Sequence, residues 1–319
     1  MLFDPKVRSF RPDADVLPLV RLLAEIESVD ESGEALTEAE LRVYLDVPQH
    51  NPETDRWVIE QPDGGLLAGQ AALYLPSDVD DRRVADGTLS VHPEWRRRGL
   101  GRELFSSLET RLGKADHVER LRFYLDPRHE AAVAFAAARG LEPNPADTYT
   151  AMHAVLADVT RAPVLPEGFT LPSYRAVDHL PTLVEALNRS FDGLVGHHHT
   201  TETDFAPHLA RLDPDGFFLL FAPDGSVAGT VSAELAPDLT ERRGVTAGRV
   251  GSPGVAAEWR SPELYVTLLL FGVAYLRGRG AEVADLQSWG DAPSIIALYA
   301  SLGFSVTHRQ IAFERVVRS

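Results

Sequence analysis

Apolar positions repeat along the chain with two different periods, which predict alternating strands and helices. Leucines recur every four residues from Leu100 to Leu112, as on the buried face of an amphipathic helix. Short apolar runs rich in aromatic residues, such as 217–221, indicate strands. Strands and helices mixed in this way predict an α+β (mixed α/β) fold built on a layered sheet.

In the first half of the chain, local signals mark where several elements begin and end. Thr37 followed by Glu40 forms a capping box, which predicts a helix start. The turn sequence 62–65 (Pro-Asp-Gly-Gly) predicts a connection between two strands. The predicted elements are strand 7–10, helix 13–25, a helix from 37, strands 57–60 and 66–74, a longer strand that ends at 89–91, helix 99–112, strand 121–125, helix 130–138 and strand 150–155.

The second half of the chain shows the same order of predicted elements. It again has two helices, a set of strands, a long helix, a strand, a short helix and a final strand. Their ranges are helices 180–190 and 201–212, strands 217–221, 227–235 and 249–255, helix 263–277, strand 283–288, helix 293–302 and strand 309–315.

Short sequence matches also recur between the two halves at a constant offset. Pro-Glu-Trp-Arg at 93–96 corresponds to Ala-Glu-Trp-Arg at 257–260, a shift of 164 residues from 93 to 257. Collinear matches of this kind indicate a duplicated domain. The same shift relates Arg11 to Arg175, Thr37-Glu38 to Thr201-Glu202, and Phe135 to Tyr299.

The boundary between the duplicated halves is predicted near residue 160. The segment 157–168 contains Pro163 and Pro166 and has no periodicity, which is typical of a linker. We therefore expect one domain at 1–160 and a second at 168–319. A chain of 319 residues also has two domains as its default expectation.

Composition narrows the classes of function. The chain has no cysteine, which excludes disulfides and zinc–thiolate sites. It also has no apolar run near the roughly 20 residues of a membrane helix, and its first residues lack a secretory pattern. We therefore expect a cytoplasmic protein.

The formal net charge of −16 repels phosphate backbones and acidic membranes, so neither nucleic acid nor membrane is expected as a partner. This charge favours a cationic small molecule such as an amine, or it serves solubility alone. No metal is expected, because the adjacent His197, His198 and His199 point in alternating directions on an extended chain. No signal for an oligomeric state is present.

One segment, 91–102, combines glycines and arginines where a predicted strand passes into a predicted helix. Gly99 and Gly101 let the main chain approach a ligand closely. A helix start offers unpaired N–H groups and a positive dipole end, which together suit a pyrophosphate. Arg96, Arg97, Arg98 and Arg102 reverse the acidic sign locally. The alternative is a helix start on an arginine-rich solvated surface.

This segment reads Val-x-Pro-x-x-Arg-x-x-Gly-x-Gly and resembles the acyl-CoA signature of the GNAT N-acetyltransferase superfamily. The string Ala-Leu-Tyr-Ala-Ser-Leu-Gly-Phe at 297–304 resembles the later helix and turn of that superfamily. The duplicated arrangement is similar to double-domain members of the mycothiol-synthase type. The resemblance implies two tandem GNAT-like domains, each a mixed, mostly antiparallel sheet flanked by helices.

The resemblance further implies an acetyl-CoA-dependent N-acetyltransferase acting on a small primary amine. Main-chain N–H groups from Arg97 to Arg102 would hold the pyrophosphate. The preceding strand would pair with the pantetheine arm and polarise the acetyl carbonyl. The residues implied in binding acetyl-CoA are Leu89, Ser90, Val91, Arg96, Arg97, Arg98, Gly99, Leu100, Gly101 and Arg102.

Each half departs from the family pattern in a different place. The family's proton-donating tyrosine corresponds to Tyr299 in the second half but to Phe135 in the first. Phenylalanine cannot donate a proton, so Tyr124 and Tyr149 are candidate general acids or else ordinary sheet tyrosines. The thiolate can also leave unassisted, since a thiol pKa near about 8.5 makes the penalty modest.

The second half keeps the tyrosine but lacks the glycines. Its sequence at 261–264 is Ser-Pro-Glu-Leu, in which Pro262 removes an N–H donor and Glu263 adds negative charge. We expect a weaker pyrophosphate site there. This half is then a scaffold or a domain adapted to another ligand, and Tyr299 is either catalytic or a packed aromatic.

The acceptor wall in the family is built partly by the segment between the first two helices. Here that segment is acidic and either attracts a cationic amine or forms a solvated loop. An alternative function is a non-catalytic acyl-CoA-binding sensor or interaction protein, favoured by Phe135. The acidic residues are Glu25, Glu27, Asp30, Glu31 and Glu34, and His197–His199 occupy the matching segment of the second half.

Overall fold

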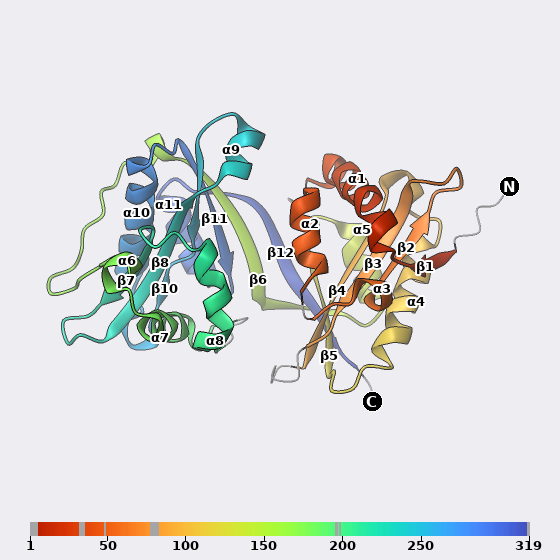
Figure 1. Cartoon of the computed structure of the whole chain (residues 1–319), viewed down its shortest axis with the longest axis horizontal. Coiled ribbons are helices and arrows are strands. Elements are labelled where there is room, and N and C mark those ends of the chain that lie inside the picture. Colours follow the sequence, from red (N-terminus) through yellow and green to blue (C-terminus); the bar gives the residue numbers. More distant parts are fainter. Residues whose placement is uncertain are drawn as a thin grey trace. The chain divides into compact units, whose positions relative to one another are not determined.

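The computed structural model of the chain describes residues 6–31, 36–47, 49–76, 83–194, 197 and 199–317. These residues form two compact units. Unit 1 consists of Met1–Asn144 with Gln310–Ser319, and unit 2 of Pro145–Arg309. Figure 1 shows a sheet covered by helices in each unit, with unit 1 mainly red to yellow and unit 2 mainly green to blue.

Unit 1 is built on a mixed sheet in which neighbouring strands are mostly antiparallel. The strand order is β1-β2-β3-β4-β5, followed by the last part of β12, and only β4 and β5 run parallel. Its elements are β1 (Val7–Ser9), α1 (Pro12–Asp30), α2 (Glu38–Leu45), α3 (Pro52–Asp55), β2 (Arg56–Glu60), β3 (Leu67–Tyr74), β4 (Val84–Val91), η1 (Pro93–Trp95), α4 (Leu100–Leu112), β5 (Arg120–Leu125) and α5 (Glu130–Ala137).

Helices cover both faces of this sheet because successive strand residues point to opposite sides. Val58 packs into the core formed by α1 and α2, whereas the next residue, Ile59, packs with α4. The two faces of the sheet can therefore carry different chemistry.

The capping box expected at Thr37 is present, since Thr37 Oγ1 accepts from the Glu40 N–H at 3.2 Å.

Unit 2 repeats this plan. Its strands are ordered β6-β11-β9-β8-β10, β7 also pairs with β8, and only β9 and β11 run parallel. The remaining elements are β6 (Glu142–Val155), η2 (Leu156–Asp158), α6 (Tyr174–Val177), α7 (Leu180–Phe191), α8 (Glu202–Phe205), η3 (Ala206–Arg211), β7 (Phe217–Phe221), β8 (Val227–Leu235), α9 (Pro237–Arg243), β9 (Ala247–Gly251), β10 (Gly254–Val255), η4 (Ala257–Trp259), α10 (Pro262–Gly278), β11 (Val283–Trp289), α11 (Pro293–Ser301) and β12 (Ser305–Val316).

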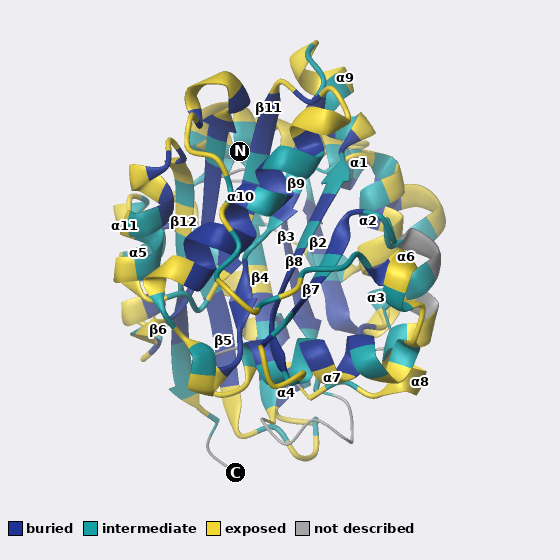
Figure 2. Cartoon of the chain, turned by 90° about the vertical axis from the view of Figure 1, so that its left-hand side faces the viewer, coloured by how far each residue is buried: buried dark blue, intermediate teal, exposed yellow. Residues whose placement is uncertain are grey.

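The two units are equivalent in detail around η1 and η4. Arg96 Nε donates to the Val91 carbonyl at 3.1 Å, and Arg260 Nε donates to the Val255 carbonyl at 3.1 Å. Both pairs are separated by the offset found in the sequence, which supports the duplication. Figure 2 shows the strands largely buried, and the core of unit 2 includes ten buried residues of α10.

The last strand of each half of the sequence completes the sheet of the other unit. Residues 149–155 of β6 pair with β11 in unit 2, and residues 311–316 of β12 pair with β5 in unit 1. Pairing satisfies strand edges that would otherwise expose N–H and C=O groups. The units thus differ at both ends from the predicted halves 1–160 and 168–319.

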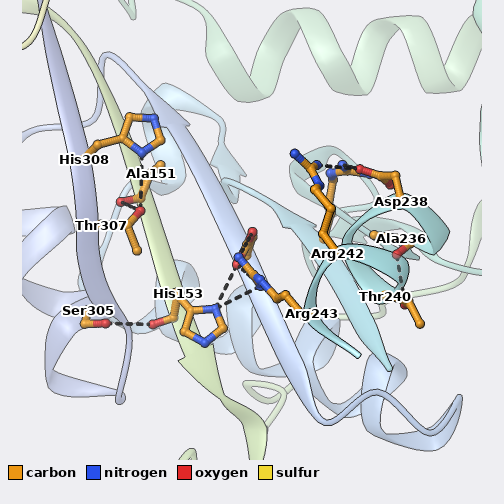
Figure 3. Close-up of polar contacts among 12 residues, drawn as sticks. Ala151, His153, Ala236, Asp238, Thr240, Arg242, Arg243, Ser305, Thr307 and His308 are labelled. Atoms are coloured by element: carbon orange, nitrogen blue, oxygen red, sulfur yellow. Dashed lines mark hydrogen bonds and ion pairs between the residues drawn. The ribbon is translucent and has the colours of Figure 1, made fainter. Parts of the chain in front are cut away.

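Side chains reinforce the contact between β6 and the start of β12 in unit 2. The hydroxyls of Ser305 and Thr307 donate to the carbonyls of His153 and Ala151, at 3.2 and 3.1 Å (Figure 3). The His153 ring pairs with Asp285 at 2.9 Å, so this histidine is held in a structural ion-pair group.

Two predicted elements of the second half are wrong in part. The predicted helix 201–212 is α-helical only in α8, and η3 follows as a 3-10 helix because Pro207 lacks the N–H of a continuing α-helix. The predicted strand 249–255 is broken after Gly251, where Ser252 and Pro253 separate β9 from β10.

None of the helices described is both long and apolar enough to cross a membrane.

Replacing Gly87 by alanine should destabilise unit 1. A Cβ atom at Gly87 in β4 would lie 2.4 Å from Cζ of Phe123 on β5. We expect a loss of about 1–3 kcal/mol in the free energy of unfolding, measured by urea denaturation. Gly113→Ala is the control, because its Cβ would lie 3.5 Å from the nearest atom in a helical conformation. Equal stability of the two variants would contradict this packing.

Candidate functional site

The turn between η1 and α4 has an unusual backbone. Arg97 and Gly99 are both left-handed, with φ angles of 64° and 89°. Gly99 is the N-cap of α4 and provides no side chain to cap the helix. Its carbonyl accepts from the N–H groups of Arg102 and Glu103, at 3.0 and 3.3 Å. This conformation turns successive N–H groups toward one side.

Residues 96 and 97 form a hydrogen-bonded turn, whereas the N–H groups of residues 99–101 donate no hydrogen bond to any other described residue. A run of such groups at a helix start forms a concave anion site, which the helix dipole reinforces. Gly101 lies against Phe135, since a Cβ there would be 3.2 Å from the phenyl ring. The main chain can therefore approach a diphosphate without an intervening side chain. Residues 97–101 are called the amide turn below.

Arginines surround the amide turn but play different parts. Arg97, Arg98 and Arg102 are exposed, and the Arg98 guanidinium lies 4.6 Å from the Trp95 ring centroid. Arg96 instead points inward, where it donates to Asp30 Oδ1 and Oδ2 at 2.9 and 2.5 Å. Arg96 thus fixes the turn to α1, whereas the exposed arginines place positive charge beside the amide turn.

Two acidic residues expected as amine ligands are engaged in this attachment. Asp30 holds Arg96, and Glu25 lies 2.9 Å from His92 Nε2. His92 Nδ1 accepts from the Glu94 N–H at 3.2 Å, so both ring nitrogens have partners. We infer that Glu25 and Asp30 position α1 over the turn. Glu34 lies outside the described residues.

β4 separates from β5 next to the amide turn. The two strands pair only from Val84 to Asp86, whereas β4 continues to pair with β3 as far as Val91. Main-chain groups of residues 87–91 thus face the gap on the β5 side. An extended amide-containing chain can add to such an edge by strand-like hydrogen bonds. Leu89, Ser90 and Val91, which the sequence analysis expects beside the pantetheine arm, lie in this stretch of β4.

Of the three tyrosines predicted as proton donors, only Tyr124 lies in the same unit as the amide turn. It is half-buried on β5, with the Arg122 guanidinium 5.0 Å from its ring centroid. Tyr149 is buried in unit 2 and packs on Trp289, with ring centroids 4.5 Å apart. Tyr299 also lies in unit 2.

Tyr299 is fully buried in a polar cluster between β9 and α11. Asp291 Oδ2 accepts from Ser252 at 2.5 Å, from Ser288 at 2.7 Å and from the Tyr299 hydroxyl at 3.4 Å. Burial raises the pKa of Asp291, and burial together with Asp291 raises the pKa of Tyr299 well above its usual value. The tyrosine hydroxyl therefore remains protonated and held by the protein itself.

The start of α10 in unit 2 has no counterpart of the amide turn. Ser261 is its N-cap, and the Ser261 hydroxyl accepts from the Leu264 N–H at 3.4 Å. None of residues 260–264 has a positive φ angle. A side chain thus satisfies the helix start, and Glu263 adds negative charge, as the sequence indicates.

The histidines of unit 2 do not form a metal centre in the described part of the chain, where no cluster of three metal-ligating side chains occurs. His197 packs near Phe191, with ring centroids 6.0 Å apart, and burial lowers its pKa. His198 lies outside the described residues.

A buried polar group that the sequence did not reveal lies on the α1/α2 face of unit 1. Arg56, Gln70 and His50 are each less than 9% exposed and are hydrogen-bonded together. The available signal was an arginine and a glutamine within two otherwise apolar strands.

The amide turn lies at the end of β4, where that strand has separated from β5. A sequence profile of the Acetyltransferase (GNAT) family matches residues 20–141, which lie in unit 1. The chain is 30% identical over 256 residues to a mycothiol acetyltransferase of Saccharomonospora viridis, covering 77% of this chain and 79% of that protein. The chain belongs to the GNAT acetyltransferase family and is an enzyme of the N-acetyltransferase type.

Other proteins resemble the chain over nearly its whole length. A mycothiol acetyltransferase of a Nocardioides species is 27% identical over 92% of this chain and 96% of its own. A GCN5-related N-acetyltransferase from Sphaerobacter thermophilus superposes with a TM-score of 0.77 at 23% identity, covering 100% and 98% of the two chains. A tandem GNAT protein from the clavulanic acid biosynthesis pathway gives 0.72 at 20% identity, covering 99% and 100%. These structures confirm the tandem fold.

Asp291→Asn should flatten the pH dependence of stability. The raised pKa means that the folded protein holds this proton more tightly than the unfolded chain, whose Asp pKa is about 3.9. Stability from this group is present at low pH and is lost as pH rises through the folded pKa. As the pH is raised from 4 to 8, the urea midpoint of unfolding should therefore fall less in the variant than in the wild type. At pH 7 the midpoint of the variant should equal or exceed that of the wild type. A parallel decline in both proteins would contradict a raised pKa.

Proposed function

We propose that the protein transfers the acetyl group of acetyl-CoA to a small primary amine and binds acetyl-CoA in unit 1. The observation that carries this proposal is the amide turn beside the gap between β4 and β5. The counterpart in unit 2 is capped by Ser261, which supports a single coenzyme site in unit 1. The absence of cysteine further supports a cytoplasmic location.

The residues of unit 1 divide the work of this reaction. The N–H groups of the amide turn hold the diphosphate, and Arg97, Arg98 and Arg102 add positive charge. Main-chain groups of Leu89, Ser90 and Val91 align the pantetheine arm and polarise the acetyl carbonyl. Bound acetyl-CoA supplies the activated thioester at which the neutral amine replaces the thiolate.

The departing thiolate takes its proton from Tyr124 or from water. Phe135, at the family's tyrosine position, cannot donate one, and it packs instead between Gly101 and Arg139. Tyr124 is our first candidate because it shares unit 1 with the amide turn. Tyr149 and Tyr299 are candidates only for chemistry in unit 2, since both lie there.

The acceptor follows less directly from the site. Relatives named mycothiol acetyltransferases make their acceptor one amine to be tested. A second candidate function is a non-catalytic acyl-CoA-binding sensor, which Phe135 favours. The two functions differ in one observable, because only the enzyme releases CoA thiol continuously when an amine is supplied.

Glutamate at Gly99 and Gly101 should abolish coenzyme binding. The side chains would fill the amide turn, and their charge would repel the diphosphate, so we expect acetyl-CoA affinity to fall at least about tenfold by calorimetry. The matched control is Gly64→Glu with Gly65→Glu in the β2–β3 turn, where no atom lies within 4 Å of either added Cβ. Unchanged affinity in the Gly99/Gly101 variant would refute the proposed site.

Tyr124→Phe tests the proton donor. We expect kcat to fall about tenfold, with little change in the KM for acetyl-CoA, because the hydroxyl acts only as the thiolate leaves. Tyr44→Phe, at a side chain that is 52% exposed on α2, is the control. Thiol release is followed over a panel of amines. Coenzyme binding without release for any amine would favour the sensor, and full activity of Tyr124→Phe would assign the proton to water.

A further inference from the structure

A buried guanidinium lies on the α1/α2 face of the unit 1 sheet. Arg56, the first residue of β2, is 4% exposed. Its NH1 donates to Gln70 Oε1 at 2.9 Å, its NH2 to the Tyr74 hydroxyl at 2.8 Å, and its Nε to His50 Nε2 at 3.3 Å. All five donors of arginine need partners when buried, and most of them are used here.

No carboxylate among the described residues forms an ion pair with Arg56. The adjacent Asp55 is paired with Arg111, at 2.7 Å. His50 remains neutral, because burial and then Arg56 lower its pKa to about 4. Its Nδ1–H donates to the Leu73 carbonyl at 2.9 Å, which leaves Nε2 to accept from Arg56. The charge of Arg56 is thus hydrogen-bonded but not neutralised, an expensive arrangement in a protein interior.

The strand register places this charge close to the gap beside β4. Gln70 and Tyr74 flank Ala72 on the same face of β3, so the guanidinium that contacts both lies over Ala72. Ala72 pairs with Arg56 on one side and with Thr88 of β4 on the other. Thr88 is thus one strand spacing, about 4.8 Å, from Ala72, on the side away from Arg56.

Gln70 carries the effect of this charge to β4. Its Oε1 accepts from Arg56, which turns its Nε2 toward Thr88 Oγ1 at 3.4 Å and Ser90 Oγ at 3.3 Å. Both hydroxyls therefore accept from Gln70 and keep their own protons to donate elsewhere. Thr88 is exposed even though β4 is a central strand, so these donors face an open surface.

We propose that the acceptor of unit 1 is an amine that also carries a carboxylate, and that Thr88 and Ser90 bind this carboxylate in the field of Arg56. The inference rests on the proposed acetyl transfer. Two aligned hydroxyl donors and a nearby uncompensated cation suit a carboxylate better than a neutral group. On a chain with a net charge of −16, an acceptor that carries a carboxylate binds only where the local electrostatic potential is positive.

The length of the acceptor follows from the same geometry. Ser90 belongs to the stretch of β4 whose main chain faces the gap expected to hold the thioester. The carboxylate and the attacking amine are therefore separated by about one strand spacing, about 4.8 Å. An extended 4-aminobutanoate comes closest to this distance, so glycine, β-alanine and 4-aminobutanoate are suitable probes because they form a series of increasing length.

The test compares each of these three acids with its own carboxamide as acceptor. We expect kcat/KM for at least one acid to exceed that for its amide about tenfold or more. Gln70→Glu should reduce this ratio below about threefold, because the new carboxylate neutralises Arg56 and repels the substrate. The same variant should unfold at higher urea, since a buried cation gains a partner. Gln61→Glu, in the β2–β3 turn, adds the same charge elsewhere and should retain the preference.

A binding measurement separates this inference from the proposed function. The three acids and amides are titrated into the protein in the presence of CoA, with Thr88→Val as an isosteric variant. Preferred binding of an acid that is weakened in Thr88→Val and Gln70→Glu supports the inference even if no amine is acetylated, a result that would defeat only the proposed function. Acetylation of amines with equal kcat/KM and equal affinity for all acid–amide pairs would overturn the inference alone.

Discussion

The inward hydrogen bond of one arginine fixes the turn on which the candidate site depends. Arg96 donates to the carbonyl of Val91 and to Asp30, so the end of β4, the turn and the end of α1 are held together. Arg260 makes the equivalent bond to Val255 in unit 2. The same frame is therefore present twice, and the residues that follow each arginine decide whether it exposes main-chain amides.

Those following residues give the two units opposite properties. In unit 1 the left-handed Arg97 and Gly99 leave amides directed outward, whereas in unit 2 Ser261 caps the helix with its own hydroxyl. Unit 2 has Tyr299 at the position of the tyrosine in the resembling family, but the Tyr299 hydroxyl is hydrogen-bonded to Asp291 and Ser252. Both units thus share the architecture, whereas the left-handed turn before the long helix is present only in unit 1 among the described residues.

The net charge of the chain and the local charge around the candidate site have opposite signs. The whole chain is strongly acidic, yet the amide turn after β4 carries exposed arginines, and the α1/α2 face of the neighbouring strands holds the buried Arg56. A binding site for anions on such a chain requires concentrated local cations, because the general field opposes it. The segment after β4 and the α1/α2 face of the sheet therefore have electrostatic features that the composition alone does not suggest.

The sequence by itself determined the layered fold, the duplication and the amide turn, because these depend on local signals: hydrophobic period, a repeated motif, and glycines at a strand-to-helix junction. Only the tertiary structure decided which last strand completes which sheet, that Glu25 and Asp30 are bound to His92 and Arg96, and that Arg56 meets Gln70 without a carboxylate. These features join residues far apart in the chain, and no local pattern encodes the register and side-chain geometry that bring them together.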